Sequence, residues 1–162
     1  MKIIFFSLFL LISTGVHSQV GQSQTKSEME SALGRKEIGS ATVSGYHIAD
    51  FFKDEELGTY TIRYHNAEYR TITDYQSLSF KASEDDIDYL FNEILKAYKT
   101  DEPMTIRLGE QEVMFKRFMK KSMSVSPMGQ GAVGFFYIDA QRLHNLFGKP
   151  FDKKAWKNYL KQ

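Results

Sequence analysis

Several short segments of this chain alternate apolar and polar residues, and turn-forming residues separate them. Thr59–His65 and Met104–Leu108 show the alternation most clearly. A period of two is typical of a half-buried β-strand, so the intervening turns predict antiparallel hairpins. Residues 41–52 allow two interpretations, a strand with a bend at Gly45 or a strand that runs into a helical turn. Further strands are expected at 69–81, 112–119 and 132–138.

One long amphipathic helix and two shorter helices are expected among these strands. Ser83 is a typical N-cap residue, three acidic residues follow it, and apolar residues then recur at helical spacing through residue 98. Two further helices are expected at 139–147 and 152–160, each beginning with an aspartate cap. The predicted fold is therefore α+β, an antiparallel, hairpin-rich sheet with one face covered by helices.

A short similarity between two parts of the chain suggests a duplication. TIRYHNAEY at 61–69 resembles TIRLGEQEV at 105–113, and each segment is followed later by a predicted helix. An insertion at 120–131, interpreted as a flexible loop, would bring the two parts into register as a strand-strand-strand-helix unit. The alternative is an α+β layout whose regularity has no common ancestry. The half-repeats of a duplicated unit would be 41–102 and 103–162.

The N-terminus predicts export from the cytoplasm. One lysine precedes a short apolar run and small polar residues follow it, as in a secretory signal peptide covering residues 1–18 with cleavage after Ser18. The protein is therefore expected to be secreted or periplasmic, with no later segment apolar enough to span a membrane. Residues 19–40 are interpreted as a flexible polar leader, with a short helix at 27–35 as an option. Residues 41–162 are expected to form one domain.

Cysteine is absent, so the domain must be held by its packed core, and thiolate metal sites and cysteine nucleophiles are excluded. Charge is unevenly distributed along the chain. Residues 19–102 carry 9 basic and 16 acidic residues, whereas residues 103–162 carry 11 basic and 4 acidic ones. Either the two halves complement each other in the fold, or a basic surface is available to an acidic partner.

The sequence contains no recognised catalytic or phosphate-binding motif, and no cofactor is expected. A small envelope hydrolase that uses His47 or His65 with a nearby tyrosine or aspartate is one alternative function. Copper binding by methionine is another, although methionine also fills irregular cores, and no dedicated metal site is predicted. The methionines concerned are Met104, Met114, Met119, Met123 and Met128.

The expected loop at 120–131, together with the basic cluster at its start, is the preferred contact surface. The members of the cluster are Lys116, Arg117, Lys120 and Lys121, and two phenylalanines are interleaved among them. Charge and aromatic rings together can hold an anionic polymer, although neighbouring strand residues point in opposite directions unless a bulge intervenes. The leading prediction is a non-catalytic binding domain for a protein or an anionic glycan or other envelope component. Nucleic acid is not expected as a partner of an exported protein.

The last predicted helix and the residue after it carry four lysines around an apolar stripe. It could lie on a membrane surface, but Trp156 and Leu160 are spaced by four residues and favour docking on the sheet.

Overall fold

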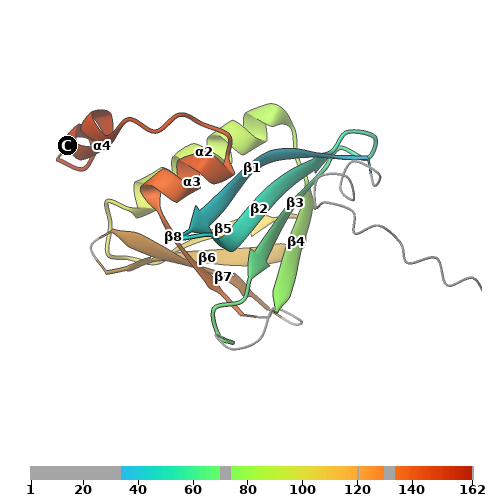
Figure 1. The fold of residues 1–162 in the computed structure, drawn as a ribbon, viewed down its shortest axis with the longest axis horizontal. Helices are drawn as coiled ribbons and strands as arrows, with labels where there is room; N and C mark the ends of the chain where they lie inside the picture. Colours follow the sequence, from blue (N-terminus) through green and yellow to red (C-terminus); the bar gives the residue numbers. More distant parts are fainter. Residues whose placement is uncertain (1–33, 70–73, 120, 130–133, 162) are drawn as a thin grey trace, which may run out of the picture.

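The computed structural model describes residues 34–69, 74–119, 121–129 and 134–161, which form eight strands and three helices (Figure 1). Four strands and a long helix are followed by four more strands and two short helices, so the predicted α+β class is confirmed. The elements are β1 (Arg35–Val43), β2 (Tyr46–Asp54), β3 (Thr59–His65), β4 (Tyr75–Lys81), α2 (Glu84–Ala97), β5 (Met104–Leu108), β6 (Gln111–Phe118), β7 (Ser122–Met128), β8 (Phe136–Asp139), α3 (Ala140–Leu146) and α4 (Lys153–Tyr159).

The strands form two antiparallel sheets, whereas the sequence had suggested one. The first sheet has the order β1-β2-β3-β4 and the second β5-β6-β7-β8, so each strand pairs with its neighbours along the chain. Figure 1 shows the first sheet lying over the second, with the three helices gathered at the upper left. Two sheets form because α2 separates the two runs of strands and each sheet contributes one apolar face to a shared interior.

The inner faces of both sheets pack with α2 and α3 into one hydrophobic core. Ile62 and Tyr64 of the first sheet, Val113 and Phe115 of the second, and Ile94 of α2 enclose the same small space. That space has a volume of about 20 Å³. This is close to the room that a single water molecule needs, so the core is filled rather than hollow.

The predicted helix caps are confirmed. The backbone N–H of Asp86 donates to Ser83 Oγ over 3.2 Å, and the backbone N–H of Ser83 donates to Asp86 Oδ2 over 2.9 Å. These reciprocal bonds form a capping box, which satisfies backbone donors at the start of α2. Asp139 and Asp152 accept backbone hydrogen bonds in the same way at the start of α3 and α4.

The predicted boundary at residues 40–41, between a flexible leader and the domain, is wrong. Residues 35–40 belong to β1, which pairs with β2 from Arg35 onward, so the ordered domain begins before residue 41. Residues 27–33 of the optional helix lie outside the described part of the chain, and Arg35 is in a strand. The ambiguity at 41–52 is settled as two strands joined by a turn at Ser44 and Gly45.

The expected loop at 120–131 is also wrong over most of its length, because Ser122–Met128 is strand β7.

The duplication is not confirmed. The segment at 61–69 starts in the third strand of the first sheet, whereas the segment at 105–113 starts in the first strand of the second sheet. The similar segments therefore occupy different positions in their sheets, and the supposed insertion is itself a paired strand.

The last helix docks on α2 and not on a sheet. The Trp156 ring meets the Tyr98 ring edge-on at a centroid distance of 5.3 Å, and Leu160 remains 44% exposed. The predicted docking is thus correct for Trp156 and wrong for Leu160 and for the surface that receives the helix. Within the described residues, no helix has the length and apolar character needed to cross a membrane.

Candidate functional site

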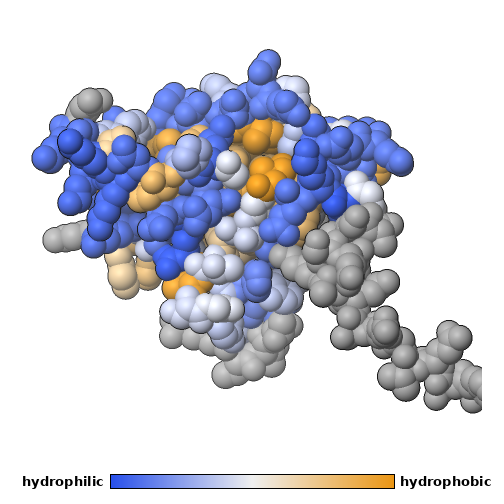
Figure 2. Space-filling view, turned by 45° about the horizontal axis from the view of Figure 1, so that its top comes forward, coloured by the Kyte–Doolittle hydropathy of each residue, from blue (hydrophilic) through white to orange (hydrophobic). Residues whose placement is uncertain are grey.

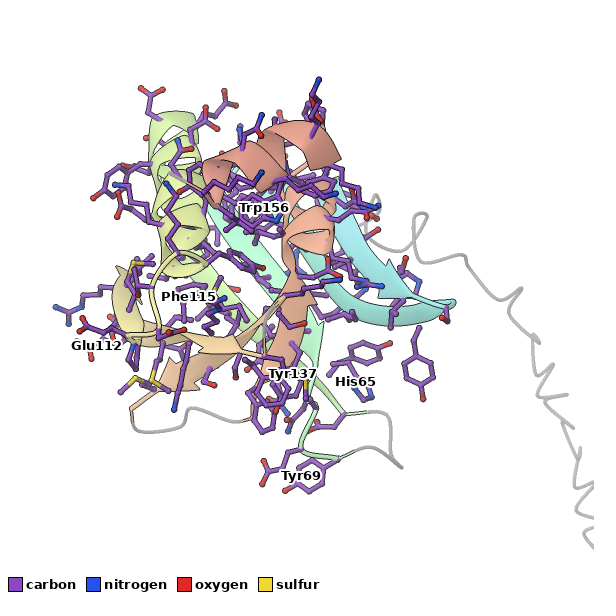
Figure 3. The ribbon with its side chains drawn as sticks, turned by 90° about the vertical axis from the view of Figure 1, so that its left-hand side faces the viewer. His65, Tyr69, Glu112, Phe115, Tyr137 and Trp156 are labelled. Atoms are coloured by element: carbon purple, nitrogen blue, oxygen red, sulfur yellow. The ribbon has the colours of Figure 1, made fainter. Side chains whose placement is uncertain are left out.

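The outer face of the second sheet combines aromatic, hydroxyl and basic side chains. In β6, Val113 and Phe115 are buried in the core, so the alternate residues Met114, Lys116 and Phe118 project from the other face. In Figure 3, Phe115 points from this sheet toward the helices, whereas Tyr137 lies on the opposite side. On this face Lys116 and Phe118 are exposed and Met114 is partly exposed, so these side chains are accessible to a partner.

Strand register brings residues from three strands into two adjacent rows. Lys116 of β6 is opposite Ser124 of β7, which is opposite Tyr137 of β8. In the next row, Phe118 is opposite Ser122. The outer residues of β7 in these rows are thus Ser122 and Ser124, and their small side chains leave space above the strand.

The rings of Phe118 and Tyr137 meet across this serine strand. Their centroids are 4.3 Å apart and their planes are inclined by 29°, which is a stacked arrangement. Phe135 adds a third ring, edge-on to Tyr137 at 5.2 Å. Phe118 remains 38% exposed, and Lys116 beside it is exposed as well. We call Lys116, Phe118, Ser122, Ser124, Phe135 and Tyr137 the aromatic row.

The four residues of the predicted basic cluster do not form one patch. Lys116 lies on the outer face, but the pairing of β6 with β7 is regular and therefore turns Arg117 to the other side of the strand. There Arg117 Nη1 donates to Asp101 Oδ1 over 3.1 Å. Lys121 is exposed in the tight β6–β7 turn, and Lys120 lies outside the described residues. The sequence-based prediction therefore contributes Lys116 to the surface and Lys121 to its margin.

The sequence analysis did not identify Tyr137 or the serines as site residues. A signal for the serines was present in SMSVSPM at 122–128, where Ser alternates with Met, Val and Pro. That period of two indicates a strand with one hydroxyl face, although the composition resembles a flexible loop. Pairing between strands also places Tyr137 beside Phe118, and no local pattern reports that contact.

The histidines of the alternative hydrolase function lie on the outer face of the first sheet. His47 Nδ1 is 3.5 Å from Oδ1 of the buried Asp50, and Arg63 Nη2 donates to the other carboxylate oxygen over 3.2 Å. The His65 ring lies edge-on to Tyr46 and Tyr75 at 6.0 and 5.6 Å. A groove of about 400 Å³ between β1 and α2 is lined by other residues, so it does not supply a substrate site to either histidine.

A further histidine, His144, lies on α3. Burial lowers the pKa of its imidazole, and nearby Lys149 acts in the same direction. Its Nδ1 donates to the Pro150 carbonyl oxygen over 2.7 Å, which gives the ring a structural role beside α4.

The methionines considered for copper are distributed over both faces of the second sheet. Met123 is fully buried in the core, and Met104 is in register with Phe115 on the same inner face. Met114 and Met128 project from the outer face. The sheet therefore separates the proposed ligands. Among the described residues, no group of three or more histidine, aspartate or glutamate side chains could hold a metal ion either.

Comparisons of this chain with protein-family models, with curated proteins and with solved structures find no match.

Proposed function

We propose that this chain is a non-catalytic binding domain that holds an anionic glycan along the aromatic row. The observation that carries the proposal is the Phe118–Tyr137 stack beside Lys116, on a sheet face where Phe118 and Lys116 are exposed. Aromatic rings present flat apolar surfaces on which sugar rings can stack, and a lysine attracts a carboxylate or sulfate group.

The shape of the surface suits an extended chain. Strand faces elsewhere bind oligosaccharides, as in OB-folds, because neighbouring strands offer side chains at regular intervals along a shallow surface. Here Ser122 and Ser124 offer hydroxyl groups between the aromatic rings and the lysine. Each hydroxyl can donate to or accept from a sugar hydroxyl.

The same composition favours a glycan over a protein partner. Protein interfaces are enriched in aromatic residues and depleted in serine and lysine, whereas the aromatic row mixes all three. The predicted signal peptide is consistent with this function, because an exported protein meets polysaccharides outside the cytoplasm. The expected affinity is modest and salt-dependent, because a single lysine of the row provides the charge attraction.

The test is titration of the protein with sulfated and carboxylated oligosaccharides, with a neutral dextran for comparison, followed by calorimetry. Saturable binding of the acidic oligosaccharides is expected. Replacement of Phe118 by Ala should weaken it about five-fold or more, since a stacked ring contributes ~1–3 kcal/mol. Lys116→Glu should also weaken binding of the acidic oligosaccharides, and the effect should be largest at low salt.

Tyr89→Ala is the matched control, because Tyr89 is 66% exposed on α2 and away from the aromatic row. It should bind as the unaltered protein does. The proposal is overturned if acidic oligosaccharides do not saturate the protein, or if Phe118→Ala and Tyr89→Ala bind equally well.

A further inference from the structure

One end of the molecule carries a concentration of lysines around α4. Lys153, Lys154 and Lys157 of α4 and Lys161 after it are all exposed, and Lys99 follows α2 at the same end. We call these five lysines the basic end. Figure 2 shows mainly hydrophilic residues on the left of the molecule, where α4 lies in Figure 1.

The way in which α4 docks leaves Lys153, Lys154, Lys157 and Lys161 facing solvent. Trp156 turns toward Tyr98, and its ring also stacks on Tyr159 at 5.4 Å. Lys99 Nζ lies 3.7 Å over the Tyr159 ring, which fixes the last turn of α4 against the end of α2. Figure 3 shows Trp156 between α4 and the rest of the chain. Because the aromatic side of α4 faces α2, its lysines project outward.

Acidic residues gather at the other end of α2. Glu84, Asp85 and Asp86 form its first turn, and Lys53 Nζ donates to Glu84 Oε1 over 2.9 Å, which brings the acidic β2–β3 turn alongside. The 14-residue helix separates the two ends by about 21 Å. Asp101, Glu102 and Asp152 also lie beside the basic end, but its five lysines outnumber them, so the two ends of α2 differ in charge. Such a difference orients a protein toward a negative surface.

We infer that the basic end binds the surface of a bilayer that contains anionic phospholipid. The five residues of the basic end are lysines, and lysine is a point charge suited to diffuse headgroup charge, whereas arginine, represented nearby by Arg117, is already paired with Asp101. Leu160, 44% exposed among these lysines, offers an apolar side chain to the interface. The aromatic row lies on another face, so this inference is independent of the proposed glycan site.

The test is sedimentation with vesicles of phosphatidylcholine alone or mixed equally with phosphatidylglycerol. The protein should bind only the mixed vesicles, and added salt should release it. Trp156 is the sole tryptophan, so its emission reports binding at this end in a second measurement. Lys153→Glu with Lys157→Glu should weaken binding at least about 25-fold, since each lysine near an anionic surface contributes about five-fold.

Lys36→Glu with Lys81→Glu is the matched control, because both lysines are exposed on the first sheet and the change in net charge is the same. The control should bind mixed vesicles with little loss, and both double variants should keep the melting temperature of the unaltered protein. Lys116→Glu should also bind normally, which separates this surface from the aromatic row. The inference is overturned if mixed vesicles do not bind, if pure phosphatidylcholine binds equally well, or if the two double variants lose binding to the same extent. Binding of polyglutamate without binding of mixed vesicles would replace the lipid with an acidic protein partner.

Discussion

Asn66 and Phe135 join the two sheets although they are 69 positions apart in the chain. The Asn66 side chain is fully buried, and its Oδ1 accepts a hydrogen bond from the backbone N–H of Phe135 over 3.3 Å. The N–H of Ala67 donates to the Phe135 carbonyl over 2.7 Å, so two bonds connect the end of β3 to the segment before β8. A buried amide with its hydrogen bonds satisfied fixes how two elements meet.

Gly134→Ala should disrupt this junction. A Cβ at Gly134 would lie 2.1 Å from Asn66 Oδ1, and the residue has a φ of +69°. We expect a loss of about 3 kcal/mol in the free energy of unfolding, from the steric clash together with the left-handed backbone. Urea denaturation measures it. Gly58→Ala is the control, since Gly58 has a φ of +58° and nothing within 4 Å, so it should lose only about 1 kcal/mol. Equal losses for the two variants would contradict a role for the contact with Asn66.

Gly39→Ala should separate β1 from α3. A Cβ at Gly39 would lie 2.0 Å from the backbone oxygen of Asn145, and backbone atoms cannot move aside as a flexible side chain can. The expected loss of stability is about 3 kcal/mol or more. Thr42→Ala, at an exposed position of the same strand, should change stability by less than about 0.5 kcal/mol. Thermal denaturation of both variants checks the prediction, and a small effect at Gly39 would show that α3 can shift without cost.

Ser83→Ala should weaken α2 and alter its dependence on pH. Loss of the cap is expected to cost about 1 kcal/mol at neutral pH. The Ser83 backbone N–H, and then its hydroxyl, lower the pKa of Asp86 in the folded protein. A carboxyl with a lowered pKa stabilises the fold at pH values above its pKa in the unfolded state. This contribution disappears as the pH falls through its pKa in the folded state.

The difference in free energy of unfolding between Ser83→Ala and the unaltered protein should therefore become smaller as the pH falls from neutral to about 3. Urea denaturation at both values measures it, with Ser77→Ala as an exposed serine control. A difference that is constant with pH would show that Asp86 does not share in the cap.

Acidification should loosen the packing of α4 through His144. Burial lowers the pKa of His144 below 6.5, so the native state binds fewer protons than the unfolded state as the pH falls through this range. This stabilisation is complete above the pKa that His144 has in the unfolded state. It is lost as the pH falls through the pKa that His144 has in the folded state. His144 and Trp156 line the same groove between α2 and α4, so Trp156 emission should shift to longer wavelength on acidification. His144→Gln should remove that shift, and its persistence in this variant would assign the transition to another group.

Local patterns were sufficient for the elements whose sequence signals agree. Residues 83–98 combine a cap, an acidic first turn and an apolar stripe, and the predicted helix differs from α2 by one residue at each end. β3 and β5 likewise match the alternating segments at both ends. These signals are local because a cap, a turn or a period of two involves residues only a few positions apart.

The missed strands depend on their neighbours. β1 has the sequence RKEIGSATV, which contains few apolar residues, yet it is held by pairing with β2 and by close contact of Gly39 with α3. β7 contains serine and proline and resembles a loop, but it lies between β6 and β8. Strand preference is set largely by such partners, and a single sequence does not state which partners a strand has.

The candidate surface could likewise be predicted only in part from the sequence. The sequence shows the basic and aromatic character of residues 116–121. It also predicts that Lys116 and Arg117 point in opposite directions unless a bulge intervenes. The stack of Phe118 on Tyr137 was not readable, because two strand pairings create it.

The sequence by itself determined the α+β class, most strand and helix positions, the helix caps and the uneven distribution of charge, because each depends on residue type and short spacing. Only the tertiary structure decided that there are two sheets, that the lysines of α4 lie at the opposite end of α2 from its acidic first turn, and that a stacked aromatic pair lies beside Lys116. These features arise from contacts between distant residues, whose formation depends on the free energy of the whole fold.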